Sequence, residues 1–129
     1  MAMIRMSSPL ARAIGLGSAK EGVEHWWAQR VTAVALVPLV LWFVIAVIGL
    51  VGADRAAVIA WVKNPMPAVF LILLLVATFY HTALGLQVVI EDYVHGEGLR
   101  LGTLMVMRFL CIVLALRGVI AVLMMALGA

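Results

Sequence analysis

The chain has 129 residues, of which 67% are hydrophobic and 12% are charged. Soluble domains are nearer half apolar and a quarter charged, so this chain has too few polar side chains to cover itself in water. The composition therefore predicts an integral membrane protein with three or four helices that cross the bilayer. Because basic residues in such a protein usually mark its topology, the net charge of +3 gives no indication of nucleic-acid binding.

Residues 1–23 are expected to form an N-terminal tail. They contain Arg5, Arg12 and Lys20, and no acidic residue comes before Glu21. This composition resembles a short organellar targeting segment. It is also typical of a cytoplasmic tail whose basic residues determine topology, which is the interpretation that we favour. No apolar segment typical of a cleaved signal peptide precedes the first predicted span.

Three apolar blocks predict membrane-spanning helices, at about residues 24–52, 66–92 and 100–128. Helices rather than strands are expected, because backbone polar groups in lipid must be satisfied within each segment. The blocks also lack the alternation of barrel strands. Pro38 lies inside the first block, and the third contains Arg108 and Arg117. The predicted fold class is an all-α membrane protein with three transmembrane helices in a single domain, residues 1–129.

The distribution of basic residues predicts the orientation. With three spans, the N-terminus and the second loop lie on the same side of the membrane. Five basic residues fall on that side and two on the other, namely Arg5, Arg12, Lys20, Arg30 and Arg100 against Arg55 and Lys63. Arg108, if it lies at its helix end, adds a sixth. The count places the N-terminus inside and the C-terminus outside, with no room for a soluble domain.

His81 is the most informative residue, because residues 66–90 contain no Asp, Glu, Lys or Arg. An ionisable side chain in lipid is costly, so it normally faces protein or a cofactor, and a metal is a common partner of imidazole. Gly85 shares its face and leaves space for a helix or a flat cofactor. Asp92 lies on this face too, about 16 Å along the axis. The alternative is a histidine that hydrogen-bonds to a neighbouring helix.

A haem fits His81 better than zinc does. Structural zinc takes four nitrogen or sulfur ligands, and the chain has no such cluster at this depth. The iron of an electron-transfer haem takes two axial ligands, which can come from different helices. His95 lies about 21 Å away along the same helix axis, and His25 precedes the first span. The second ligand is therefore expected on another polypeptide.

A second candidate site lies at the inner membrane edge, where polar and aromatic residues flank the first two spans. Its members are His25, Trp26, Trp27, Arg30, Asp92, Tyr93 and His95. A quinone carbonyl needs a donor such as a tyrosine hydroxyl, and its reduction needs ionisable groups that deliver protons. An arginine near a haem can pair with propionate carboxylates. Alternatively, the tryptophans anchor the interface and Asp92 forms an ordinary solvated ion pair with Arg100.

Segments 22–33 and 80–94 resemble the hydrophobic membrane anchor subunit of succinate dehydrogenase. The resemblance includes a helix histidine, a glycine four residues later and an Asp-Tyr pair that closes the helix. It implies that His81 is one axial ligand of haem b, with the other ligand on a partner anchor subunit, and that Arg30 lies near the haem propionates. It also implies that Tyr93 hydrogen-bonds ubiquinone and that Asp92 supports this pocket. We expect Gly85 to pack against the haem.

The same resemblance implies a complex with a second membrane anchor subunit, an iron–sulfur subunit and a flavoprotein subunit. The expected location is a bacterial inner membrane in preference to the mitochondrial one. The soluble subunits would oxidise succinate and pass electrons to ubiquinone, so this chain alone would not be an enzyme. One alternative is a fumarate reductase anchor of the same architecture. Another is a cofactor-free transporter or assembly subunit with His81 and Asp92 as a proton relay, although between His81 and Glu91 only Gln87 is strongly polar.

Three residues have no role in this resemblance. Arg117 falls near the middle of the third helix, where arginine disfavours insertion by about 2.5–3.5 kcal/mol. It is expected to reach the outer headgroups or a partner subunit, or else a haem propionate. His95 has no counterpart in the family pattern. Cys111 lies in an apolar run and is expected to be a small buried hydrophobic residue.

Overall fold

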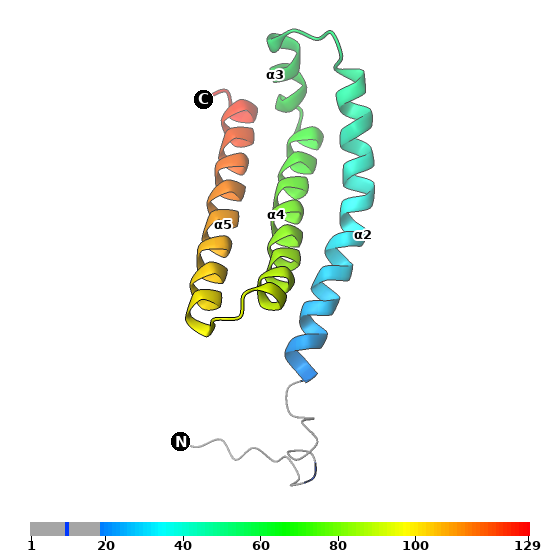
Figure 1. The fold of residues 1–129 in the computed structure, drawn as a ribbon. Coiled ribbons are helices and arrows are strands. Elements are labelled where there is room, and N and C mark those ends of the chain that lie inside the picture. Colours follow the sequence, from blue (N-terminus) through cyan, green and yellow to red (C-terminus); the bar gives the residue numbers. More distant parts are fainter. Residues whose placement is uncertain (1–9, 11–18) are drawn as a thin grey trace, which may run out of the picture.

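Three long helices dominate the computed structural model, which describes residues 10 and 19–129 (Figure 1). The elements are α2 (Ala19–Gly49), α3 (Arg55–Lys63), α4 (Pro65–Tyr93) and α5 (Glu97–Leu127). The prediction of three long apolar helices is confirmed, but it did not include α3, a fourth and shorter helix. Most of the predicted tail, residues 1–23, lies outside the described residues, although α2 already begins at Ala19.

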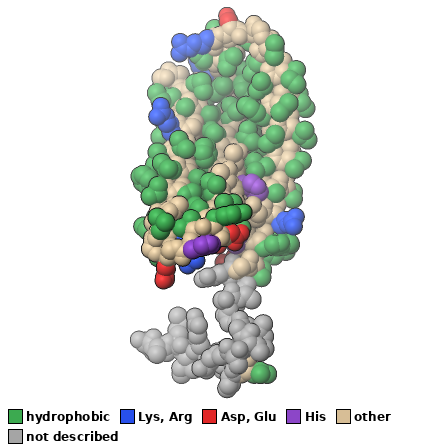
Figure 2. All heavy atoms as spheres, in the orientation of Figure 1, with side chains coloured by type: hydrophobic (Ala, Val, Ile, Leu, Met, Phe, Trp, Pro, Cys, Tyr) green, Lys and Arg blue, Asp and Glu red, His purple; other side chains and the backbone are tan. Residues whose placement is uncertain are grey.

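The long helices have the length and composition of membrane spans. Apolar stretches of 28, 29 and 31 residues form most of α2 and all of α4 and α5. At 1.5 Å per residue they measure about 42–46 Å, longer than a hydrocarbon core of about 30 Å, so their ends can reach the headgroups. Most large apolar side chains are exposed. Figure 2 shows them as a broad band, with charged groups mainly towards the two ends.

The central helix of the bundle is α4. It packs against α2 on one side and α5 on the other, whereas among the described residues the backbones of α2 and α5 do not approach each other closely (Figure 1). Gly118 brings α5 close to α4, because a Cβ atom at this position would lie 3.1 Å from both methyl carbons of Leu75. Pro38 lies inside α2, and a proline is tolerated in a membrane helix when local adjustments satisfy the freed carbonyl.

Local capping explains the short helix α3. The Asp54 side chain accepts a hydrogen bond from the backbone N–H of Ala57 at 2.8 Å, which satisfies one of the free donors at the helix start. Asn64 then ends α3 and precedes α4, whose first residue is Pro65. Proline suits this position, because its missing N–H would have no partner in the first turn. The chain therefore turns between two helices with a single intervening residue.

The best-packed part of the bundle lies where α3 meets the other helices. Val62 is only 2% exposed and packs with Ala68 of α4 and Val122 of α5. Trp42 of α2 stacks on Trp61 of α3, with ring centroids 5.9 Å apart. These contacts hold all four helices together at the end of the bundle opposite the N-terminus of α2.

Candidate functional site

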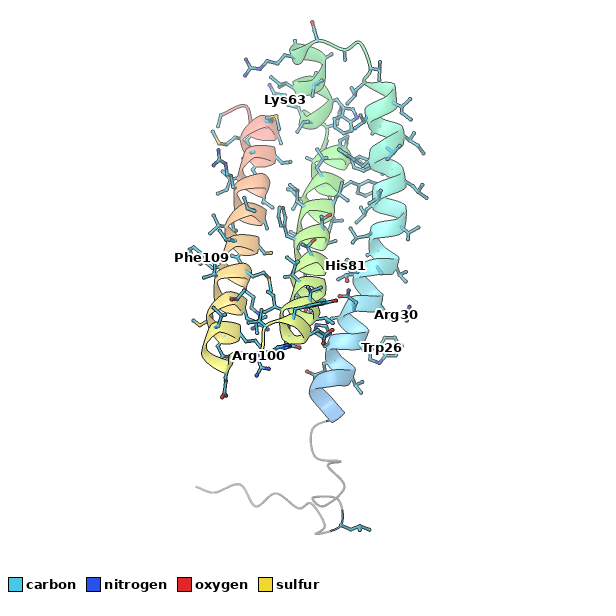
Figure 3. The ribbon with its side chains drawn as sticks, in the orientation of Figure 1. Trp26, Arg30, Lys63, His81, Arg100 and Phe109 are labelled. Carbon is cyan, nitrogen blue, oxygen red and sulfur yellow. The ribbon has the colours of Figure 1, made fainter. Side chains whose placement is uncertain are left out.

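His81 lies half-buried where α4 faces α2 (Figure 3). Its Nδ1 atom is 2.8 Å from the Oγ1 atom of Thr32. The same hydroxyl is 2.7 Å from the carbonyl oxygen of Ala28, one turn earlier in α2. A hydroxyl has a single proton, and without it two oxygens at this distance would repel each other. Thr32 therefore donates to the backbone carbonyl and accepts a hydrogen bond from the Nδ1–H group of His81.

This hydrogen bond selects one tautomer of His81. A neutral imidazole with its proton on Nδ1 has a free lone pair on Nε2, the form in which histidine binds a metal. Metal-bound histidines typically donate their other ring N–H to an oxygen. The expected alternative, a hydrogen bond to a neighbouring helix, is thus observed, but it uses only one ring nitrogen. The sequence prediction did not include Thr32.

Three polar residues of α2 form a seam that faces α4, and we call His25, Gln29 and Thr32 the polar seam of α2. Their spacing of four and three residues places them on one helix face. The Nε2 atom of His25 and the Oε1 atom of Gln29 are buried and have no hydrogen-bond partner in the described structure. Leaving such a buried polar group unpaired costs about 1–3 kcal/mol of folding free energy. The polar seam of α2 can therefore still form hydrogen bonds with a polar group of a ligand or partner.

Gly85 lies opposite this seam. A Cβ atom added to Gly85 would lie 3.8 Å from the Nε2 atom of Gln29, an ordinary van der Waals contact. A helix or a flat cofactor was expected beside this glycine. In the described structure the helix α2 of the same chain lies there. The packing of Gly85 against a haem stays a prediction.

Arg30 points away from His81. Its guanidinium lies 5.3 Å from the ring centroid of Trp26, and both side chains are on the side of α2 away from α4 (Figure 3). The cause is helical geometry, because Arg30 and Thr32 differ by about 200° around the axis. The chain alone therefore does not bring Arg30 and His81 together. A propionate that met both would have to reach around α2, and this role of Arg30 stays a prediction.

Asp92 and Tyr93 are exposed at the end of α4, near the level at which α2 begins. Tyr93 is 79% exposed, so its phenol group is accessible to a molecule from outside the chain. His95 follows in the short connection to α5 and is also exposed. The predicted inner-edge residues therefore share one end of the bundle, but within this chain they do not enclose a pocket.

A polar chain that the sequence prediction did not include joins α5 to α4. The Arg108 guanidinium donates to the Oε1 atom of Gln87 at 2.9 Å. The amide nitrogen of Gln87 donates in turn to a carboxylate oxygen of Glu91, also at 2.9 Å. We call this set the Arg108–Gln87–Glu91 chain. Gln87 and Glu91 are four residues apart on one helix, so the sequence could have predicted the hydrogen bond between them but not the contact with Arg108.

No group of three or more His, Cys, Asp and Glu side chains within the described part of the chain could hold a metal ion. A metal bound to His81 would therefore need further ligands from outside these residues. Arg117 is exposed on α5, and Cys111 is half-buried with its sulfur 4.0 Å from that of Met107.

Comparison with known proteins identifies the family to which the chain belongs. Residues 4–122 match the family described as succinate dehydrogenase/fumarate reductase transmembrane subunit. A succinate dehydrogenase hydrophobic membrane anchor subunit of Rickettsia bellii is 33% identical over 113 residues, which are 88% of this chain and 90% of the relative. The protein of the same name from Paracoccus denitrificans is 37% identical over 93 residues, 72% of each chain. The succinate dehydrogenase membrane anchor subunit of Reclinomonas americana is 31% identical over 96 residues, 72% of this chain and 80% of the relative.

These matches agree with the three long apolar helices and with the predicted resemblance. The match to the family extends over all four described helices except the end of α5. The chain is an integral membrane protein that belongs to the succinate dehydrogenase/fumarate reductase transmembrane subunit family.

Proposed function

We propose that this chain is the membrane anchor subunit of a succinate:ubiquinone oxidoreductase in a bacterial inner membrane. It would dock the iron–sulfur and flavoprotein subunits and pair with a second membrane anchor subunit. The relatives' names support succinate oxidation as the physiological direction, whereas the family description covers fumarate reduction as well. The basic residues support an N-terminus inside and a C-terminus outside.

The hydrogen bond between Thr32 and His81 is the observation that carries the haem-binding part of this proposal, and the family carries the rest. It holds the imidazole in the tautomer that offers Nε2 to iron, and a haem b bound there would supply a one-electron redox centre. The unpaired Nε2 atom of His25 and Oε1 atom of Gln29 belong to the same helix face. These features fit a cofactor that brings polar groups and a second ligand from a partner subunit.

Tyr93 would form part of the ubiquinone site. Its exposed hydroxyl can donate a hydrogen bond to a quinone carbonyl, and Asp92 beside it can hold or transfer a proton. Both residues lie at the end of the bundle that we expect to face the soluble subunits. The remaining walls of such a pocket would come from the partner subunits, because this chain alone leaves Tyr93 open on most sides.

The test is a His81→Ala variant of the purified complex, with His95→Ala as the matched control. His95 is an exposed histidine on the connection after α4, so its loss should leave the haem b spectrum unchanged. His81→Ala should remove or shift the reduced-minus-oxidised haem b bands. Unchanged bands and haem content in His81→Ala would refute the ligand assignment.

The same spectrum separates the two other candidate functions. A cofactor-free transporter or assembly subunit predicts that no haem bands accompany the purified complex. A fumarate reductase anchor predicts haem bands or quinone binding but faster turnover in the direction of fumarate reduction. Identifying the quinone that purifies with the complex would distinguish this direction further.

A further inference from the structure

A cavity of about 470 Å³ lies between α4 and α5, away from the seam that contains His81. It runs along both helices from Val76 and Leu116 at one end to Gln87 and Arg108 at the other. Val76 and Gln87 are about 16 Å apart along the α4 axis. Apart from Gln87, Arg108 and the hydroxyl of Tyr80, the lining is apolar. We call this cavity the α4–α5 groove.

The groove has one cationic end. Arg108 is exposed, and its hydrogen-bond partner in the described structure is the neutral amide of Gln87. An arginine carries five N–H donors, so most of them remain available for an anion. Because Gln87 is itself held by Glu91, the Arg108–Gln87–Glu91 chain fixes the guanidinium at the end of the groove. The Glu91 carboxylate reaches the guanidinium only through Gln87 and forms no direct ion pair with it in the described structure, and a cation at this depth in lipid is costly unless an anion compensates it.

The direction of the Arg108 side chain matches a lipid headgroup. Helix side chains lean towards the N-terminus of their helix, which for α5 is the end near Tyr93 and the start of α2. The guanidinium therefore extends from the apolar part of the groove towards the nearer membrane surface. Arginine binds phosphate with two parallel hydrogen bonds, and basic pockets between membrane helices bind anionic lipid headgroups.

We propose that the α4–α5 groove binds an anionic phospholipid, with its phosphate at Arg108 and one acyl chain along the apolar lining. Both helices span the membrane, so the groove runs parallel to the lipid chains beside it. A partner helix would fill the groove with side chains but would leave the cation without its anion unless it carried an acid at the same depth. The charge complementarity therefore favours a lipid.

The experiment uses the assembled complex, reconstituted in phosphatidylcholine with a minor fraction of phosphatidylglycerol, and measures retained lipid by native mass spectrometry. Wild type should retain phosphatidylglycerol in preference to phosphatidylcholine. Arg108→Gln should lower this retention by about tenfold, the scale of a lost charge-assisted hydrogen bond. Arg117→Gln is the matched control, because Arg117 is exposed on the opposite side of α5, about 180° from Arg108.

A second variant tests the apolar part of the site. Ala115→Phe places a ring in the groove and keeps Arg108, so it should also reduce retention while the helical circular dichroism stays unchanged. Equal losses in Arg108→Gln and Arg117→Gln would overturn the proposal, because they would indicate general surface charge. Absence of selective retention in wild type, or a cross-link from Ala115→Cys to a partner subunit's helix, would overturn it too.

Discussion

Thr32→Val is the substitution that most directly tests how His81 is positioned. Valine has nearly the shape of threonine but cannot accept a hydrogen bond, so the Nδ1–H group of His81 loses the partner that lies at 2.8 Å. Leaving such a half-buried donor unpaired costs about 1–3 kcal/mol. Loss of the group that orients a metal-bound histidine typically lowers metal affinity 10–100-fold. The content of the haem b that we propose at His81 should therefore fall in purified Thr32→Val complex, or this haem should dissociate faster.

The midpoint potential of the proposed haem b provides a second measurement on the same variant. A hydrogen bond from Nδ1–H makes the imidazole a stronger electron donor, which favours oxidised iron. Its loss should raise the potential by about 60 mV for each tenfold change in the relative affinity for the two oxidation states. Thr32→Ser keeps the hydroxyl and is the control. If Thr32→Val had the wild-type haem content and potential, or if Thr32→Ser shifted the potential equally, the reasoning would be refuted.

Three further predictions concern other parts of the chain. Tyr93→Phe should lower ubiquinone reduction by about tenfold and leave succinate oxidation by an artificial acceptor intact, whereas loss of both activities would indicate failed assembly. Gly118→Val should lower the stability of the chain by about 1–3 kcal/mol in thermal unfolding, because its Cβ would meet Leu75 at 3.1 Å. Gly118→Ala adds less volume and should lower the stability by a smaller amount. Equal stability of the two variants would contradict this reasoning. Asp54→Ala should lower the unfolding free energy by about 0.5–2 kcal/mol through loss of the bond to Ala57, and Asp54→Asn should retain most of it.

The long helices could be predicted because lipid leaves a spanning segment few alternatives. An uncharged run of sufficient length must satisfy its backbone internally, so the apolar blocks became α2, α4 and α5. The helix α3 was missed because its nine residues, an apolar run between Arg55 and Lys63, are too short for a span. Its signal was nevertheless present, since Asp54 is a favourable N-cap residue directly before the segment.

Helical periodicity also predicted part of the site. It placed Gly85 on the face of His81, and the structure shows both residues against α2. It could not identify Thr32 or Arg108, because each contact depends on how far one helix is shifted along another. The position of Arg30 was predictable in principle, since a separation of two residues from Thr32 places it on nearly the opposite side of α2.

The arrangement of α2, α4 and α5 also affects how the molecule can come apart. Because the backbones of α2 and α5 do not approach each other closely in the described structure, α2 is held in the bundle through its contacts with α4 and α3. Separating α2 from the α4–α5 hairpin would have to break the tryptophan stack of α2 and α3 at one end and the hydrogen bond between Thr32 and His81 at the other. A substitution that removes one of these two contacts should therefore loosen α2 at that end of the molecule and leave the packing of α5 on α4 intact.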